Sequence, residues 1–302
     1  MEPLLTPEQQ ESFNHYICAQ KHSQNPIPNP LVAYCGTLGS YAEEAAIGYF
    51  GKASRRLSHK TFEDVFKSIT GRGADYGVLP IENSSTGSIA SVYDLLAKYN
   101  CFIVGETEVK VEHCLMGIPG SSIDTIKEVY SHAQGFSQSE DYLALHDDWK
   151  CIPYFNTAIA AKYVSESGNL SFAAIASRRA ADMHHLELLA ENINYSDTNV
   201  TRFVIVSGTM ENRPNRNKIS IAFHVPHTSG ALFHVLSIFD QYHLNLCKIE
   251  SRPTKSCNWE YIFFIDFMSI ANGLDLDTVI ENVITQTEGF QFLGYYEQYL
   301  LS

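Results

Sequence analysis

Residues 31–50 read LVAYCGTLGSYAEEAAIGYF and divide into three parts. The run Val32–Cys35 is short and apolar, which is typical of a buried strand. The segment Gly36–Ser40 holds two glycines and a serine, and it predicts a tight turn that leads into a helix N-terminus. The residues Ala42–Phe50 then have the spacing of an amphipathic helix. A strand, a tight turn and a helix in this order are the repeating unit of an α/β fold.

The same alternation continues along the chain. Further strands are predicted at Tyr76–Ile81, Phe102–Val104, Glu128–Tyr130, Ile152–Phe155, Phe172–Ile175 and Phe203–Val206. Helices are predicted between them at Phe62–Ser68, Ile89–Tyr99, Phe136–Leu145, Ala158–Ser165 and Arg178–Met183. Because helical crossovers join parallel strands, residues 31–210 are expected to form an α/β domain with a largely parallel sheet.

The two ends of the chain have different patterns. Residues 1–30 resemble an extension, with a short helix predicted at Glu8–Gln20. Residues 211–217 (ENRPNRN) have the composition of a linker. Residues 218–302 then predict a ferredoxin-like βαββαβ domain. Its strands are expected at Lys218–Val225, Leu246–Arg252, Tyr261–Phe267 and Phe290–Tyr296, and its helices at Gly230–Tyr242 and Leu274–Thr287.

The composition excludes several classes of protein. The chain has 302 residues, 45% of them hydrophobic and 12% aromatic, which is enough apolar surface to build cores. Its formal net charge of −13 argues against binding to nucleic acid, which requires a basic surface. No apolar run reaches the roughly 18 residues of a membrane span. The polar N-terminus has no secretory signal, and the seven scattered cysteines suggest a reducing compartment, so a cytoplasmic protein is expected.

Polar residues follow the ends of several predicted strands. They form the segments Gly36–Tyr41, Glu82–Ser88, Ser131–Gln134 and Asn156–Thr157. Ligands of doubly wound sheets bind at this edge, where helix N-termini attract anions. Each segment alone is also an ordinary helix cap, but together they predict a carboxylate-binding cleft. The glycine-rich turn lacks the third glycine of a dinucleotide site and the lysine of a phosphate loop, and the histidines lack metal-ligand spacing.

A further candidate is the polar loop that runs into Thr201-Arg202-Phe203. One interpretation is the entry to a hairpin with a surface arginine. The other is a functional strand that presents a hydroxyl and a guanidinium, which could bind a carboxylate through two hydrogen bonds. The spacing alone leaves both interpretations open.

Taken in order, these segments resemble the sequence blocks of prephenate dehydratases. The blocks are Tyr34-Cys35-Gly36-x-x-Gly39-Ser40-Tyr41, residues 77–84 (GVLPIENS), Ser131-His132-x-Gln134, residues 174–177 (AIAS) and residues 199–203 (NVTRF). Residues 218–302 look like the ACT regulatory domain of that family, through Gly230-Ala231-Leu232 and Glu250-Ser251-Arg252-Pro253. The resemblance covers the chain from about residue 31 to near its C-terminus.

The resemblance implies a catalytic domain of two lobes, similar to type-2 periplasmic binding proteins. It implies conversion of prephenate to phenylpyruvate, with loss of carbon dioxide and water and without a cofactor. Thr201 matches the central catalytic threonine, and Arg202 matches an arginine expected to hold a substrate carboxylate. Other matching positions are expected in catalysis (Phe203, Ser88, Asn83 and Glu82) or in substrate binding (Gly39, Ser40, Ser84, His132, Gln134, Thr157, Ser177 and Asn199).

The second domain implies regulation. ACT domains of this family bind L-phenylalanine at an interface between subunits, which predicts feedback inhibition and a homodimer or homotetramer. The residues expected at that site are Gly230, Ala231, Leu232, Glu250, Ser251, Arg252 and Pro253. Residues 1–30 are too short for the chorismate mutase domain found in some members, so a monofunctional enzyme is expected. Arogenate dehydratase activity is the alternative, and a non-catalytic amino-acid sensor is a more distant one.

Overall fold

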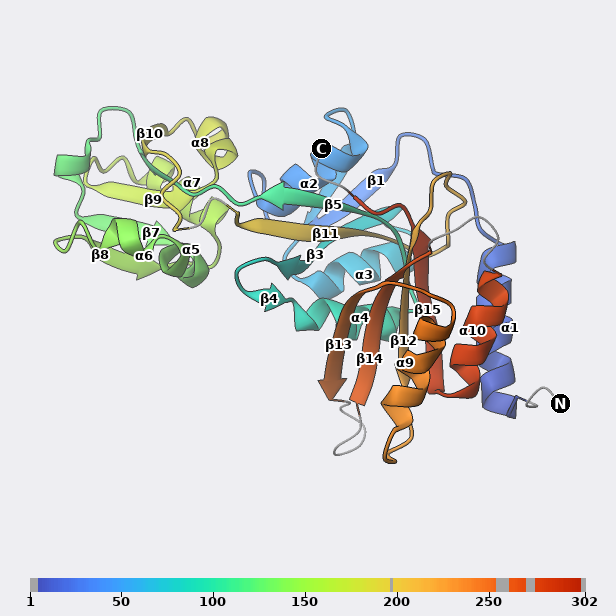
Figure 1. Ribbon diagram of the computed structural model, residues 1–302. Coiled ribbons are helices and arrows are strands. Elements are labelled where there is room, and N and C mark those ends of the chain that lie inside the picture. Colours follow the sequence, from blue (N-terminus) through green and yellow to red (C-terminus); the bar gives the residue numbers. More distant parts are fainter. Residues whose placement is uncertain (1–4, 196–197, 254–260, 270–274, 300–302) are drawn as a thin grey trace.

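The computed structural model describes residues 5–195, 198–253, 261–269 and 275–299. Within these residues the strands form three sheets, ordered β2-β1-β3-β11-β5 with β4 beside β3, β10-β6-β9-β7-β8, and β13-β14-β12-β15. Figure 1 shows the sheets in a row, with the first between the other two. We call the first two sheets, with their helices, the first and second lobes. The third sheet and its helices form the C-terminal unit.

The first lobe is a mixed sheet with helices on its faces. Its strands are β1 (Leu31–Cys35), β2 (Arg55–His59), β3 (Tyr76–Asn83), β4 (Gly87–Ser88), β5 (Phe102–Lys110) and β11 (Val200–Ser207), and its helices are α2 (Tyr41–Phe50), α3 (Phe62–Thr70) and α4 (Ala90–Tyr99). Strand β1 is parallel to β2 and β3, whereas β11 is antiparallel to both β3 and β5. Strand β11 returns from the second lobe, which reverses its direction in the sheet.

The second lobe is inserted between β5 and β11. Its strands are β6 (Cys114–Gly117), β7 (Glu128–Ser131), β8 (Lys150–Pro153), β9 (Phe172–Ala176) and β10 (Glu187–Ala190), and its helices are η1 (Ile123–Thr125), α5 (Ala133–Gln138), α6 (Glu140–Leu143), α7 (Thr157–Ser167) and α8 (Arg178–His184). Its core is separate from that of the first lobe and is rich in alanine, which lets α7 and α8 approach the sheet closely. The chain therefore crosses between the lobes twice, after β5 and before β11.

The C-terminal unit has the predicted order βαββαβ. It consists of β12 (Lys218–His224), α9 (Ala231–Gln241), β13 (Leu246–Pro253), β14 (Tyr261–Met268), α10 (Leu276–Thr285) and β15 (Glu288–Tyr296). Alternate strand residues point to opposite faces of the sheet. Ile219, Ile221 and Phe267 pack against α9 and α10, whereas Phe264 and Leu293 join the core of the first lobe. The sheet is thus packed on both faces, apart from the exposed alternate residues of its edge strand β13.

Helix α1 (Pro7–Lys21) packs on the C-terminal unit, although it begins the chain. A capping box formed by Thr6 and Gln9 starts it, and Pro7 occupies its first turn. The ring of Tyr16 contacts that of Phe292 with centroids 4.8 Å apart, and its hydroxyl donates to Asp277 at 2.6 Å. The N-terminal extension is therefore part of the packed structure (Figure 1).

The structure confirms the alternation of strands and helices and corrects three details. The sheets of the two lobes are mixed, so the prediction of a largely parallel sheet was wrong. The helix predicted at Phe136–Leu145 is two short helices, α5 and α6, which meet at Ser139. Four strands were missed: β4, β6, β10 and β2, whose residues (RRLSH) are mostly polar and half-exposed. Leu274, where the last helix was expected to begin, lies outside the described residues.

Candidate active site

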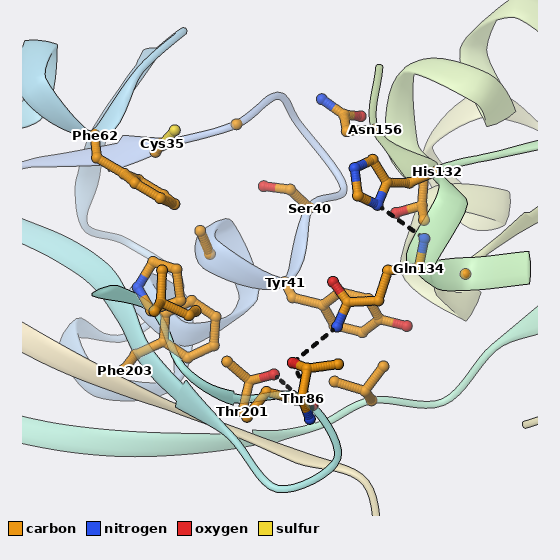
Figure 2. Close-up of a pocket in the computed structure, with 18 of the residues that line it drawn as sticks. Cys35, Ser40, Tyr41, Phe62, Thr86, His132, Gln134, Asn156, Thr201 and Phe203 are labelled. Carbon is orange, nitrogen blue, oxygen red and sulfur yellow. Dashed lines mark hydrogen bonds between the residues drawn. The ribbon is translucent and has the colours of Figure 1, made fainter. Parts of the chain in front are cut away.

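A cavity of about 610 Å³ lies where the two lobes meet. The first lobe lines it with residues from the turn before α2 and from β3 and β11, and the second lobe with residues from the turns before α5 and α7. Figure 2 shows Phe62 and Phe203 on one side of this space and His132 and Asn156 on the other. Seven of the predicted residues line it: Ser40, Asn83, His132, Gln134, Thr157, Thr201 and Phe203.

Thr201 and Asn83 form a hydrogen-bonded polar pair in the cavity. They face each other across β11 and β3, and the amide of Asn83 donates to Thr201 Oγ1 at 2.9 Å. The side-chain oxygen of Asn83, Oδ1, accepts hydrogen bonds from the backbone N–H groups of Ser85 and Thr86, so the side-chain amide has a fixed orientation. Because Thr201 Oγ1 accepts from Asn83, its own O–H can be donated to a ligand. Thr201 is only 8% exposed, which strengthens such a hydrogen bond.

Gln134 links the two lobes across the cavity. Its side chain donates to Thr86 Oγ1 at 3.3 Å, from α5 to the turn after β3 (Figure 2). His132 caps α5 and accepts from the backbone N–H of Gln134 at 3.2 Å. The residues of the Ser131–Gln134 segment therefore position one wall of the cavity against the other.

The cavity is suited to an anion. Ser40 caps α2 and Asn156 caps α7, and both of these residues line the cavity. A helix N-terminus carries a positive partial charge and unpaired N–H groups. Among the described residues, Lys60 is the only lysine or arginine that lines the cavity, and it follows β2 directly.

Two of the polar cavity residues that were not predicted are His113 and Gln138, which lie near Tyr41 of the predicted Gly36–Tyr41 segment. His113 Nε2 lies 2.8 Å from Gln138 Oε1, and the Tyr41 hydroxyl donates to the carbonyl of Glu112. Burial lowers the pKa of His113, although the hydrogen bond to Gln138 acts in the opposite direction. The amide nitrogen of Gln138 is buried without a hydrogen-bond partner among the described residues. Gln138 follows Gln134 by one helical turn, a spacing that could have identified it.

Four predicted residues support the cavity from outside it. Asn199 accepts from the amide of Asn83 at 2.8 Å, and the hydroxyl of Ser84 donates to the carbonyl of Thr198 at 3.0 Å. The Ser177 hydroxyl donates to the carbonyl of Gly39 at 3.0 Å, which connects the lobes. Gly39 has a φ of +82°, and a Cβ there would lie 3.1 Å from the Cα of Ala180, so a larger residue would not fit.

Arg202, Glu82 and Ser88 point away from the cavity. Alternate residues of a strand face opposite sides, so Arg202 lies behind a sheet whose front presents Thr201 and Phe203. Its guanidinium donates to Glu82 and Glu106, each at 3.0 Å. A bulge between β3 and β11 turns Glu82 to this same side, and Ser88 donates to Glu250 of the C-terminal unit. The structure thus does not place Arg202 beside a ligand in the cavity.

The predicted effector residues also divide into two groups. Gly230, Ala231 and Leu232 line a second cavity of about 430 Å³, together with the residues before α9 and with Tyr261 and Phe263 of β14. Glu250 and Arg252 face the first lobe, where they contact Ser88 and Asp94. Ser251 and Pro253 alternate with them along β13 and are exposed.

The chain matches known proteins over most of its length. Residues 32–211 match the sequence model of the prephenate dehydratase family. A bifunctional chorismate mutase/prephenate dehydratase of Neisseria gonorrhoeae is 34% identical over 89% of this chain and 75% of its own length. Arogenate dehydratase 5 of Arabidopsis thaliana is 35% identical over 88% of this chain and 67% of its own.

Solved structures agree in fold. A prephenate dehydratase from Arthrobacter aurescens, in complex with L-Phe, has a TM-score of 0.78 at 27% identity and covers 88% of this chain and 89% of its own. GqqA, described as a novel type of quorum quenching acylase, has a TM-score of 0.80 at 27% identity and covers 89% of this chain and 98% of its own.

Proposed function

This chain belongs to the prephenate dehydratase family, and we propose that its cavity between the lobes converts prephenate to phenylpyruvate. The observation that carries the proposal is the Thr201 hydroxyl, which Asn83 holds in a cavity with two helix N-termini and one lysine. Prephenate is a dicarboxylate with a ring hydroxyl, so it needs anion-binding groups and one donor for the departing oxygen.

In this proposal Thr201 donates a hydrogen bond to the ring hydroxyl of prephenate. The C–O bond breaks as the ring carboxylate leaves as carbon dioxide, and the electrons of the broken C–C bond complete the aromatic ring. The departing oxygen takes up one proton, supplied in the end by the solvent, and leaves as water. Asn83 fixes the Thr201 oxygen before the reaction, and such preorganised donors are worth about 2.7–4 kcal/mol of barrier.

The carboxylates of the substrate have three candidate partners. These are the N-termini of α2 and α7 and the ammonium of Lys60. Apolar side chains also line the cavity, among them Phe62, Phe155 and Phe203. They provide a surface for the ring and a less polar environment for the departing carboxylate, and carbon dioxide forms more readily where water is excluded.

Incubation of the purified chain with prephenate, followed by chromatography for phenylpyruvate, tests this proposal. Arogenate is tested in parallel, because the similarity to an arogenate dehydratase favours that substrate as a second candidate. Turnover of prephenate at the higher kcat/KM supports the proposal. A higher kcat/KM with arogenate would make arogenate the substrate of the same decarboxylating dehydration. Turnover of neither compound would contradict both candidate functions.

The proposal includes feedback regulation. Residues 218–302 are assigned to an ACT domain, supported by their βαββαβ order, and the two lobes to the type-2 periplasmic binding protein arrangement, supported by the two chain crossings. The second cavity is the candidate site for L-phenylalanine, supported by the L-Phe complex of the Arthrobacter relative. The exposed side chains of Phe233 and Tyr261 near it suit contact with a second subunit. An L-phenylalanine titration of the activity tests the effector, and light scattering tests the oligomer.

A further inference from the structure

Six charged side chains meet where the first lobe packs on the C-terminal unit. We call them the ion cluster: Glu82, Glu106 and Arg202 from the first lobe, and Lys218, Lys248 and Asp266 from the C-terminal unit. Three positive charges balance three negative ones. Glu106 and Lys218 have side chains only 2% and 4% exposed, so their charges are stabilised by one another and not by water.

Arg202 connects both sides of this interface. One of its nitrogens donates to Glu106 at 3.0 Å and to Asp266 at 3.2 Å, and the other to Glu82 at 3.0 Å. Burial opposes the charge of the guanidinium, but Asp266 and Glu106 outweigh it and raise the pKa of Arg202 above its ordinary value. Arg202 therefore stays charged and bound to all three carboxylates.

Two lysines of the C-terminal unit complete the cluster. Lys218 donates to Glu106 at 2.9 Å, and Lys248 donates to Glu82 at 2.7 Å. Lys248 also donates to Ser88, which in turn donates to Glu250 at 2.7 Å. Burial would raise the pKa of Glu82, but Lys248 and Arg202 outweigh it and lower that pKa. The C-terminal unit thus binds β3, β5 and β11 through ionic contacts and β4 through hydrogen bonds of Ser88.

The ion cluster lies one residue from the proposed catalytic pair. Arg202 is the register partner of Glu82 on β3, and the adjoining partners are Thr201 and Asn83. The first pair faces the C-terminal unit, and the second faces the cavity. A shift of the C-terminal sheet that moves Arg202 and Glu82 must also move the backbone that carries Thr201 and Asn83.

Strand β13, which carries four of the predicted effector residues, also contacts the ion cluster. Lys248 and Glu250 lie on β13, where inward-facing residues alternate with the exposed Ser251 and Pro253. Asp266 lies on β14, which also supplies Phe263 to the second cavity. Ligand binding at that cavity and the position of the catalytic pair can therefore affect each other through two strands.

We propose that Arg202 is a positioning residue for the Asn83–Thr201 pair, and that Asp266 and Lys248 transmit the state of the C-terminal unit to it. This inference rests on the proposed function for its kinetic consequences. It gives Arg202 a role that needs no contact with substrate. Because binding free energies are reciprocal, substrate in the first cavity should also change affinity for an effector in the second.

The test replaces Asp266 with asparagine, a residue of the same size that leaves the cavity untouched. We expect kcat with prephenate to fall about 10-fold while KM changes less than about twofold, because misplacing a catalytic group slows the reaction without weakening ground-state binding. We also expect about a 10-fold faster hydrogen exchange of backbone amides in residues 200–207. The matched control is Asp148→Asn, which breaks an exposed ion pair with Lys127 in the second lobe.

Each outcome decides the proposal. Lower kcat at constant KM together with faster exchange in β11 supports it, and Asp266→Asn behaving like Asp148→Asn in both measurements overturns it. If Asp266→Asn does not fold, Arg202→Lys replaces it, since lysine keeps the charge but cannot hold three carboxylates in a fixed geometry. Arg202→Lys with wild-type kcat and exchange overturns the proposal. If the wild-type chain does not turn over prephenate, the proposed function fails, and the exchange comparison alone decides the inference.

Discussion

The two faces of the β3–β11 strand pair differ in chemistry although neighbouring residues build them. The cavity face presents uncharged donors and an aromatic ring, from Asn83, Thr201 and Phe203. The opposite face presents the ion cluster, in which Arg202 contacts three carboxylates. A charged ligand can be bound by uncharged hydrogen-bond donors that are held in position. At a permanent interface between two parts of the chain, charged side chains can instead pair with one another when the protein folds. Substitutions on the first face should therefore affect turnover directly, and those on the second should affect stability and, through the position of Thr201 and Asn83, turnover by a smaller factor.

The largest expected effect is the loss of folding stability when a charge is removed from the ion cluster. Lys218→Met leaves three carboxylates and only two cations in the buried ion cluster, with Arg202 alone to pair with Glu106 and Asp266 among the described residues, and we expect the free energy of unfolding to fall by about 3–5 kcal/mol in urea titrations. Lys127→Met, which removes an exposed pair with Asp148, should cost at most about 1 kcal/mol. Equal losses in the two variants would show that the cluster is no more important than a surface pair.

On the cavity face, Thr201→Val keeps the shape of the side chain and removes its hydroxyl. We expect kcat to fall by about 10²–10³-fold, the usual effect of losing one preorganised donor. The free energy of unfolding should change by less than about 1.5 kcal/mol, since one hydrogen bond from Asn83 is lost. Thr201→Ser is the control and should retain most of the activity. A fully active Thr201→Val would remove the threonine from the mechanism.

A smaller effect is expected at Gln138. Its buried amide nitrogen lacks a partner among the described residues, so a substrate oxygen is the expected acceptor. Gln138→Met should lower kcat/KM by about 5- to 150-fold, which corresponds to the roughly 1–3 kcal/mol of a buried hydrogen bond. Gln10→Met, on the exposed surface of α1, is the control. Unchanged kcat/KM would mean that this amide does not contact the substrate.

The smallest effect is expected at Lys60, which is exposed at the cavity. An exposed charge pair is worth up to about 1 kcal/mol, so Lys60→Gln should raise KM by about fivefold at most. The increase should shrink at high salt, because salt screens exposed charges. Lys52→Gln, also exposed but outside the cavity, should leave KM unchanged. A larger effect for Lys52 would indicate general electrostatics in place of a local contact.

The comparison also shows what could be predicted from the sequence. Short apolar runs and polar turns identified most strands and the cavity residues at strand ends, because helix N-termini have a strong local signature. Thr201 and Asn83 were found through a sequence resemblance, and the structure brings them together.

The direction of Arg202 could not be predicted, because it depends on which face of β11 the C-terminal unit covers. The bulge opposite Arg202 also depends on tertiary structure, and it turns Glu82 away from the cavity. Likewise, inward-facing and exposed residues alternate along β13. Glu250 and Arg252 are inward-facing and contact the first lobe, so they do not line the cavity of Gly230. Motif matching does not detect this alternation.

The packing of α1 has a consequence for the order of synthesis. Tyr16 and its partner Asp277 are 261 residues apart in the sequence. At about 5–20 residues per second, a ribosome needs roughly 13–50 seconds to make the stretch between them. Helix α1 is thus synthesised long before α10 and β15. Its apolar face lacks its native packing partners while both lobes are being made. The helix made first takes its place last, and the C-terminal unit reaches its final packing only when the two ends of the chain meet.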